Sequence, residues 1–156
     1  MRWLIDTNVL VRLRDQQSAH FSACVQAIAK VRAHGDVLCV CTQVAIEYFV
    51  VATRPVEVNG IGLSCEQAIQ DVRDFRRLFL WLPEPPDIIN AWEQTVVKYG
   101  ITGKQAHDAR LIALMLAHGV EGILTLNTVH FQRYLEVRAE SPYQLINESE
   151  YHHDPS

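Results

Sequence analysis

Short apolar runs alternate with longer segments of helical periodicity along most of the chain. Near-continuous apolar runs are typical of strands that are buried on both faces. Such runs occupy residues 3–5, 37–41, 78–82 and 122–126, with a weaker one at 135–137. The helical patterns cover residues 9–14, 18–33, 42–54, 64–77, 87–99 and 106–118. Strands that alternate with helices predict an α/β fold, here a three-layer α/β/α arrangement with a central parallel sheet of about five strands.

Punctuating residues mark several of the expected helix ends. Thr42 can cap the helix that follows the second apolar run. Pro55 should end that helix, because the residue before a proline avoids the helical conformation. Ser64 with Gln67 three residues later forms a capping-box pattern, which predicts the start of another helix. Gly119 is placed to end the last long helical segment.

Length and composition fit one globular domain. The chain has 156 residues, of which 49% are apolar and 21% charged, so it can bury a hydrophobic core and is not expected to be disordered. We expect a single domain over residues 1–146 and a polar, flexible C-terminal tail over 147–156. The formal charge of -4 argues against a basic protein that coats nucleic acid along its length. It does not exclude a local basic groove.

The cysteines and the lengths of the apolar runs indicate the cellular compartment of the protein. None of the four cysteines forms a C-x-x-C pair, and Cys39 and Cys41 alternate within an apolar run, which favours core positions over metal ligation. The apolar runs are far shorter than the roughly 20 residues of a membrane span. No secretory signal is visible at the N-terminus. These features predict a cytoplasmic protein with free thiols and no membrane association.

Three acidic residues stand in otherwise apolar surroundings. Asp6 ends the first apolar run, Glu47 lies in the helix after the second, and Asp108 lies in the first turn of a strongly apolar helix. A buried carboxylate is costly unless it is paired or binds a metal. Parallel sheets form their sites at the carboxyl ends of the strands, where Thr125 and Asn127 also fall. The pattern therefore predicts one acidic pocket at that rim.

Each acid also has a simpler interpretation. Asp6 could only cap a helix, Glu47 could be a solvated helix residue, and Asp108 could pair with Arg110 or Lys104. Taken together, clustered carboxylates repel one another, and a divalent cation removes that conflict. Mg²⁺ prefers oxygen ligands and usually takes one or two carboxylates directly. Such a pocket fits nucleases, and it also fits phosphatases and other enzymes that handle phosphoryl groups.

The order of the motifs narrows the choice. The run Leu4 to Leu10, then Glu47 in its helix, then His107 to Leu111, then Leu124 to His130, resembles the PIN-domain nucleases. It is most similar to the VapC-type toxins of bacterial toxin–antitoxin pairs, over about residues 2–138. The resemblance implies cleavage of RNA that depends on Mg²⁺, with Mn²⁺ as a substitute. It also implies a homodimer and inhibition by a small antitoxin protein.

The resemblance also assigns roles to individual residues. Asp6, Glu47 and Asp108 match the three acidic positions of the family. Asp6 and Asp108 would ligate the metal directly or through water. Glu47 would ligate through water or help to activate the attacking water. Thr7 and Asn8 match the polar pair after the first Asp, and they could hold substrate or position Asp6.

Two positions depart from the family pattern. Thr125 matches a common hydroxyl position, but the fourth acidic position falls at Asn127, and a frequent Asp three residues later is His130. Asn127 can still offer a carbonyl oxygen or hold a water. The pocket nevertheless has one negative charge fewer. We therefore hypothesise weaker metal binding, or binding that favours Mn²⁺.

An RNA substrate needs positive partners for its phosphates. Arg12, Arg14 and Lys104 are close in sequence to the proposed pocket and are expected to contact the RNA backbone. A second cluster consists of Arg73, Arg76 and Arg77. Single-stranded or looped RNA is favoured over a duplex, because chemistry at a deep rim needs an exposed strand.

The predicted helix is apolar on every face over residues 111–117, so each of its faces should be buried against another part of the protein or a second subunit. Packing within one domain and contact with a second subunit explain it equally well.

Three functions compete at this point. The leading one is a metal-dependent endoribonuclease that acts as the toxin of a toxin–antitoxin pair. The alternative is a catalytically weakened PIN-like protein that binds or processes RNA, and Asn127 and His130 motivate it. The third is a small phosphatase with Asp6 as nucleophile, which is disfavoured because that chemistry usually needs an Asp where Asn8 stands.

Overall fold

Five parallel strands form the central sheet of the computed structural model, which describes residues 1–148. The order across the sheet is β3-β2-β1-β4-β5, and every neighbouring pair is parallel. The chain first adds strands on one side of β1 and later returns to add β4 and β5 on the other, so the order reverses beside β1. The strands are β1 (Arg2–Ile5), β2 (Val37–Cys41), β3 (Leu80–Leu82), β4 (Gly122–Leu124) and β5 (Arg138–Glu140).

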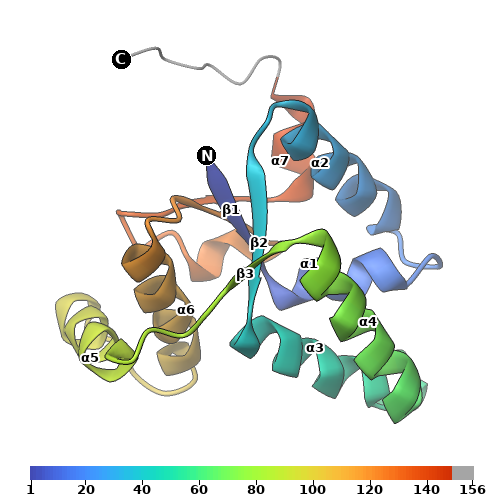
Figure 1. Cartoon of the computed structure of the whole chain (residues 1–156), viewed down its shortest axis with the longest axis horizontal. Coiled ribbons are helices and arrows are strands. Elements are labelled where there is room, and N and C mark those ends of the chain that lie inside the picture. Colours follow the sequence, from blue (N-terminus) through green and yellow to red (C-terminus); the bar gives the residue numbers. More distant parts are fainter. Residues whose placement is uncertain (149–156) are drawn as a thin grey trace.

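Helices cover both faces of this sheet, which confirms the predicted three-layer α/β/α fold (Figure 1). On one side lie α1 (Thr7–Arg14), α2 (Phe21–Ala33), α3 (Thr42–Thr53), α4 (Cys65–Leu78) and α7 (Pro142–Asn147). On the other side lie α5 (Ile88–Tyr99) and α6 (Gln105–His118). Two short 3-10 turns complete the described elements, η1 (Val56–Val58) and η2 (Thr128–His130).

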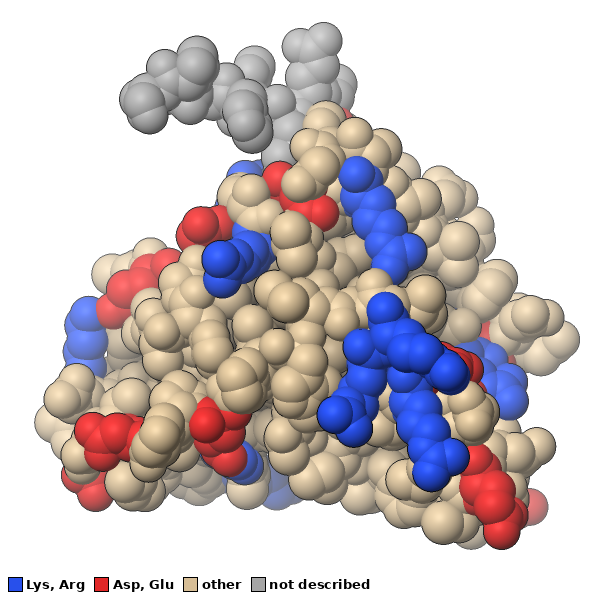
Figure 2. Space-filling model, viewed as in Figure 1, with Lys and Arg blue, Asp and Glu red and all other residues tan. Residues whose placement is uncertain are grey.

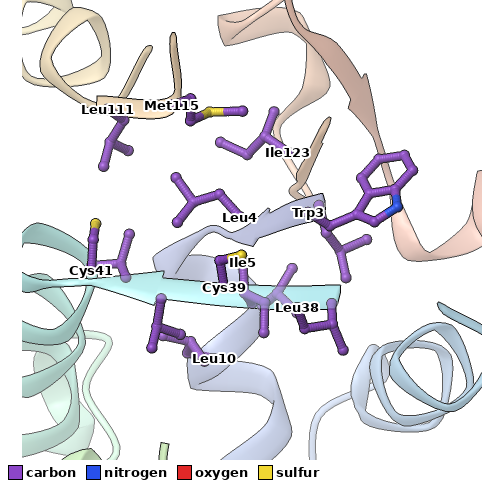
Figure 3. Packing of buried hydrophobic residues seen from close by; sticks show 14 of the residues in the cluster. Trp3, Leu4, Ile5, Leu10, Leu38, Cys39, Cys41, Leu111, Met115 and Ile123 are labelled. Carbon is purple, nitrogen blue, oxygen red and sulfur yellow. The ribbon is translucent and has the colours of Figure 1, made fainter. Parts of the chain in front are cut away.

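The core fills both spaces between the sheet and the helices. Figure 3 shows Leu4 of β1 pointing toward Leu111 and Met115 of α6, while Leu10 of α1 lies on the opposite side of the sheet. These side chains are all buried. Cys39 and Cys41 of β2 are buried among them, as the sequence predicted, and burial raises the pKa of both thiols. All four cysteines are free.

The apolar segment at residues 111–117 is explained mainly by packing inside the domain. Residues 111–115 are buried between the sheet and α5, which packs along α6. Leu116 is 43% exposed, so the end of the segment faces outward. Cover by a second subunit is therefore not needed for most of this helix.

Several predicted boundaries are confirmed by the hydrogen bonds. Ser64 Oγ accepts the Gln67 N–H, and Gln67 Oε1 accepts the Ser64 N–H, which is the expected capping box. The helix from Thr42 ends at Thr53, just before Pro55. Gly119 ends α6 with φ +64°, a conformation that favours glycine.

The C-terminal part of the fold differs from the prediction. Residues 135–137 form a turn, with the Val137 N–H bonded to the Tyr134 carbonyl oxygen, and Leu135 is 87% exposed. Strand pairing begins only at residue 138, so β5 is Arg138–Glu140. The hydrophobic pattern did not predict α7, because its six residues are too few for a clear helical period.

α7 occupies the end of the described chain. It ends at Asn147, and residues 149–156 of the predicted tail lie outside the described residues. Within residues 1–148, no helix combines the length and the apolar character that crossing a membrane requires.

Candidate active site

Asp6 lies at the junction between β1 and α1. Its backbone N–H donates to the Leu124 carbonyl oxygen at 2.9 Å, so the contact between β1 and β4 extends to this residue. Its Oδ1 accepts the Thr7 backbone N–H at 2.8 Å, as a helix cap does. Capping is therefore one role of Asp6, but it occupies only one of the two carboxylate oxygens.

The other oxygen, Asp6 Oδ2, accepts two side-chain hydrogen bonds. Thr125 Oγ1 donates to it at 2.7 Å and Asn8 Nδ2 at 3.2 Å. Asn8 Nδ2 also donates to Thr125 Oγ1 at 3.2 Å, and Asn8 Oδ1 accepts the Leu126 N–H at 3.0 Å. Asn8 thus joins α1 to the end of β4. Of the two roles that the sequence left open for Asn8, this geometry favours positioning Asp6.

The environment of Asp6 opposes its negative charge. The residue is 8% exposed, and burial raises the pKa of its carboxyl to about 6. The hydrogen bonds from Thr125 and Thr7 lower the pKa, whereas the charges of Asp108 and Glu47 raise it. The three carboxylates therefore lie close enough to repel one another.

Glu47 reaches the same region from α3. Its Oε2 accepts the Thr7 hydroxyl at 2.9 Å, and its Oε1 accepts Gln43 Nε2 at 3.1 Å. Gln43 also donates to the His107 carbonyl oxygen at 2.9 Å, which ties α3 to the start of α6. Both oxygens of Glu47 are oriented by these bonds, unlike those of a solvated helix residue.

Asp108 lies in the first turn of α6 and is half-buried. Burial raises the pKa of its carboxyl, and the charge of Glu47 adds to the rise. Three nearby basic side chains, those of His130, His107 and Arg133, act in the opposite direction and lower this pKa. Asp108 does not pair with Arg110, which instead forms an ion pair with Glu84.

These side chains meet at a cleft of about 290 Å³ at the carboxyl end of the sheet. Seven residues that the sequence singled out line it: Asp6, Thr7, Asn8, Arg12, Asp108, Asn127 and His130. Glu47 is joined to the cleft through its bond to Thr7, and Thr125 is fully buried beneath Asp6. Lys104 is exposed in the turn before α6.

A model of the PIN domain family matches residues 3–136 of the chain. The chain belongs to the PIN domain family. A search of curated proteins found no match to it.

Solved structures with the same fold contain VapC and related toxins. A chain of the VapBC2 complex of Rickettsia felis, bound to a DNA fragment from its promoter, aligns with a TM-score of 0.66. It is 14% identical and covers 90% of this chain and 98% of that one. A chain of VapBC-1 of nontypeable Haemophilus influenzae aligns with a TM-score of 0.64 and is 18% identical. The alignment covers 92% of this chain and 99% of that one. VapC20 of Mycobacterium tuberculosis, a toxin that cleaves the sarcin–ricin loop, aligns with a TM-score of 0.57 and is 16% identical. That alignment covers 79% of this chain and 87% of VapC20.

Only one of the two arginine side chains of α1 faces the cleft of this PIN domain. Arg12 lines the cleft, and its Nη1 is 3.8 Å from Asp15 Oδ2, beyond hydrogen-bond length. Arg14 points elsewhere, because its Nε donates to Asp71 Oδ2 at 3.0 Å. Of the two arginines in α1, the structure therefore leaves Arg12 to face a ligand.

Two residues beside the carboxylates of the PIN domain, Gln43 and Arg133, were not predicted from the sequence. Gln43 is buried, and its Nε2 holds both Glu47 and the start of α6. A glutamine four residues before Glu47, in an apolar stretch, was the available signal. Arg133 influences Asp108 from the segment after η2, and no pattern in the sequence indicated that contact.

The PIN cleft suits an ion that uses few protein ligands. Within residues 1–148, no three His, Cys, Asp or Glu side chains are grouped to hold one ion together. Mg²⁺ needs no such group, because it typically takes one or two carboxylates and keeps several waters. Burial is the main reason that the pKa values of Asp6 and Asp108 are raised, and a bound cation would favour the charged forms of both carboxyl groups. The oxygen donors of this cleft therefore fit Mg²⁺ or Mn²⁺.

Proposed function

We propose that this PIN domain is a metal-dependent endoribonuclease that hydrolyses RNA phosphodiester bonds. The observation that carries the proposal is the convergence of three carboxylates from different elements: Asp6 and Asp108 line one cleft, and Glu47 is joined to it through the hydroxyl of Thr7. Membership of the PIN domain family supports the same reading.

The three carboxylates have distinct tasks in this proposal. Asp6 and Asp108 hold Mg²⁺, or Mn²⁺ in its place, directly or through water. When bound, such an ion lowers the pKa of a coordinated water and stabilises charge on phosphodiester oxygens. Glu47 Oε1 and Oε2 are held by Gln43 and Thr7, so Glu47 is placed to accept a proton from the attacking water.

The surrounding residues orient the acids and the RNA. Thr125 and Asn8 fix Asp6 Oδ2, and Thr7 joins Asp6 to Glu47. Arg12 supplies positive charge for a phosphate at the rim. Asn127 and His130 also line the cleft, so they contact substrate or water. Lys104 is exposed before α6 and would contact the RNA backbone outside the cleft.

The test is cleavage of labelled cellular RNA by metal-stripped protein, with and without added Mg²⁺ or Mn²⁺. The parent is compared with the double variant Asp6→Asn/Asp108→Asn. A matched control, Glu66→Gln/Glu93→Gln, removes two carboxylates that are exposed on α4 and α5. We expect discrete, metal-dependent fragments from the parent and the control, and none from the cleft variant.

Other outcomes would change the proposal. Folded parent protein that cleaves no RNA with any metal would favour the alternative, a weakened PIN-like protein that binds RNA. Equal cleavage by the cleft variant would move the site away from Asp6 and Asp108.

We further propose that the chain is the cytoplasmic toxin of a toxin–antitoxin pair and forms a homodimer. The structures of toxin–antitoxin complexes with the same fold support this. A groove of about 310 Å³ between α5 and α6, lined by Ile89 and Trp92 among others, offers apolar surface for a protein contact. Growth arrest on expression, relieved by a short neighbouring reading frame, is the expected result. Size measurement in solution tests the homodimer.

A further inference from the structure

We infer that a second cleft, next to the acidic one, binds the nucleotide that flanks the scissile phosphate of a single-stranded RNA. In this subsite Arg12 contacts a phosphate and Tyr143 stacks on a base. The inference rests on the proposed ribonuclease function, because it assigns another part of the same substrate.

The two clefts are continuous. The second has a volume of about 520 Å³ and shares Asn8, Arg12 and Asn127 with the acidic cleft. Its size is in the range of sites for small molecules, about 300–1,000 Å³, which accommodates a nucleotide. A strand that leaves the carboxylates past Asn127 would therefore enter it directly.

An ordered aromatic side chain forms the far wall of this cleft. Tyr143 of α7 is 42% exposed, so its ring is accessible. Its hydroxyl lies 2.6 Å from Nδ1 of His20, and the two rings meet edge to face with their centroids 5.8 Å apart. A ring held in this way loses little entropy when a base stacks on it. Stacking on aromatic rings is the common means by which proteins hold unpaired bases.

The charge of the second cleft suits a phosphate. Among the described residues that line it there is no Asp or Glu, whereas Arg12 lies at the boundary with the acidic cleft. The weak contact of Arg12 with Asp15, at 3.8 Å, leaves the guanidinium able to bind an anion. The subsite thus attracts the phosphodiester chain that the three carboxylates would repel.

The arginine cluster on α4 is a competing surface for nucleic acid. Figure 2 shows Lys and Arg side chains gathered over α4, where Arg73, Arg76 and Arg77 are exposed. These residues lie in the last turns of α4, directly before β3 begins, and so at the opposite end of the sheet from the carboxylates. Arg77 pairs with Asp74, and the Arg76 guanidinium lies 5.1 Å from the centre of the Trp81 ring. The cluster is therefore a suitable control rather than the flanking subsite.

The experiment measures binding of a short, fluorescein-labelled single-stranded RNA by fluorescence anisotropy in the presence of a chelator. It compares the parent with Tyr143→Ala, Tyr143→Leu, Tyr143→Phe and Arg12→Gln. Tyr143→Leu keeps apolar bulk against α2, so it separates stacking from folding. Arg73→Gln, which also removes one positive charge, is the charge-matched control on α4.

We expect Tyr143→Ala and Tyr143→Leu to weaken RNA binding about 5- to 100-fold, the range for loss of one stacked base. Tyr143→Phe should stay within a few fold of the parent. Arg12→Gln should reduce the slope of log Kd against log salt by about one, whereas the α4 control should not change binding. A parent that binds no single-stranded RNA, or parent-like binding by both Tyr143→Ala and Tyr143→Leu, would overturn the subsite.

Cleavage kinetics keep the two proposals distinguishable. If the parent cleaves RNA and Tyr143→Ala retains the parent KM, the subsite is wrong and the ribonuclease stands. If the parent cleaves nothing but Tyr143→Ala and Tyr143→Leu still lose RNA affinity, the ribonuclease fails and the subsite stands. With both correct, KM rises in Tyr143→Ala while kcat changes little.

Discussion

Thr125 is fully buried and holds the acidic site together through one hydroxyl. This hydroxyl donates to Asp6 Oδ2 at 2.7 Å and accepts from Asn8 Nδ2 at 3.2 Å and from the Asn127 backbone N–H at 3.0 Å. Thr125→Val replaces it by a methyl group of similar size, so packing is nearly preserved while all three hydrogen bonds are lost.

The cost of that substitution follows from the three bonds. A hydrogen bond to a charged group contributes about 1.5–3 kcal/mol, and the Asp6 bond is of this kind. Asn8 keeps its bonds to Asp6 and Leu126, and Asn127 is exposed, so its N–H can turn to water. We therefore expect Thr125→Val to lower the free energy of unfolding by about 2–3 kcal/mol, mainly through Asp6.

Urea unfolding of the metal-free protein measures this effect, with Thr125→Ser as the matched control. The serine retains the hydroxyl and loses one buried methyl, which costs about 1 kcal/mol. RNA cleavage should fall more than tenfold in Thr125→Val and stay within a few fold of the parent in Thr125→Ser. A valine variant that unfolds at the parent urea concentration, or a serine variant less stable than the valine one, would refute this reasoning.

Three further predictions concern other parts of the molecule. Gly122→Ala should cost about 1–3 kcal/mol of stability in urea unfolding, because an added Cβ would lie 2.4 Å from Trp3 Cε3; an unchanged midpoint would contradict this. Asn127→Asp should bind Mg²⁺ more tightly in a calorimetric titration, since it restores a negative charge at the cleft, and no tightening would dismiss the hypothesis that Asn127 weakens the metal site. Burial raises the pKa of Glu140 to about 7 from 4.5, so between these values the folded state retains a proton that the unfolded state has released. The free energy of unfolding should therefore fall as the pH rises through this interval, and Glu140→Gln should show a much smaller fall in thermal unfolding between about pH 4.5 and 8.

The features that the sequence predicted well depend on local patterns. The strand at 37–41 is an unbroken apolar run, and the helix from Cys65 begins at a capping box, so neighbouring residues alone determine both. The position of Asp6 at the end of a strand was also predictable from local sequence, because the apolar run stops at this residue. The reversal of strand order beside β1 then brings the ends of β1 and β4 together.

The features that the sequence did not predict depend on contacts between distant segments. β5 is short and lies at residues 138–140, where its pairing with β4, rather than its own composition, decides its position. Gln43 acquires its role only because α6 starts beside α3. Tyr143 and His20 are 123 positions apart, and only the docking of α7 on α2 makes them neighbours.

The pairing of Asp6 with Thr125 has a consequence for synthesis of the protein. The two residues are 119 positions apart, so the bond between them cannot form while the ribosome still holds the later strands. Until β4 emerges, β1 has a partner only at β2, and its other edge stays open. A nascent chain therefore carries Asp6 and Glu47 long before it carries an assembled site. The complete cleft can form only after β4 has emerged and paired with β1.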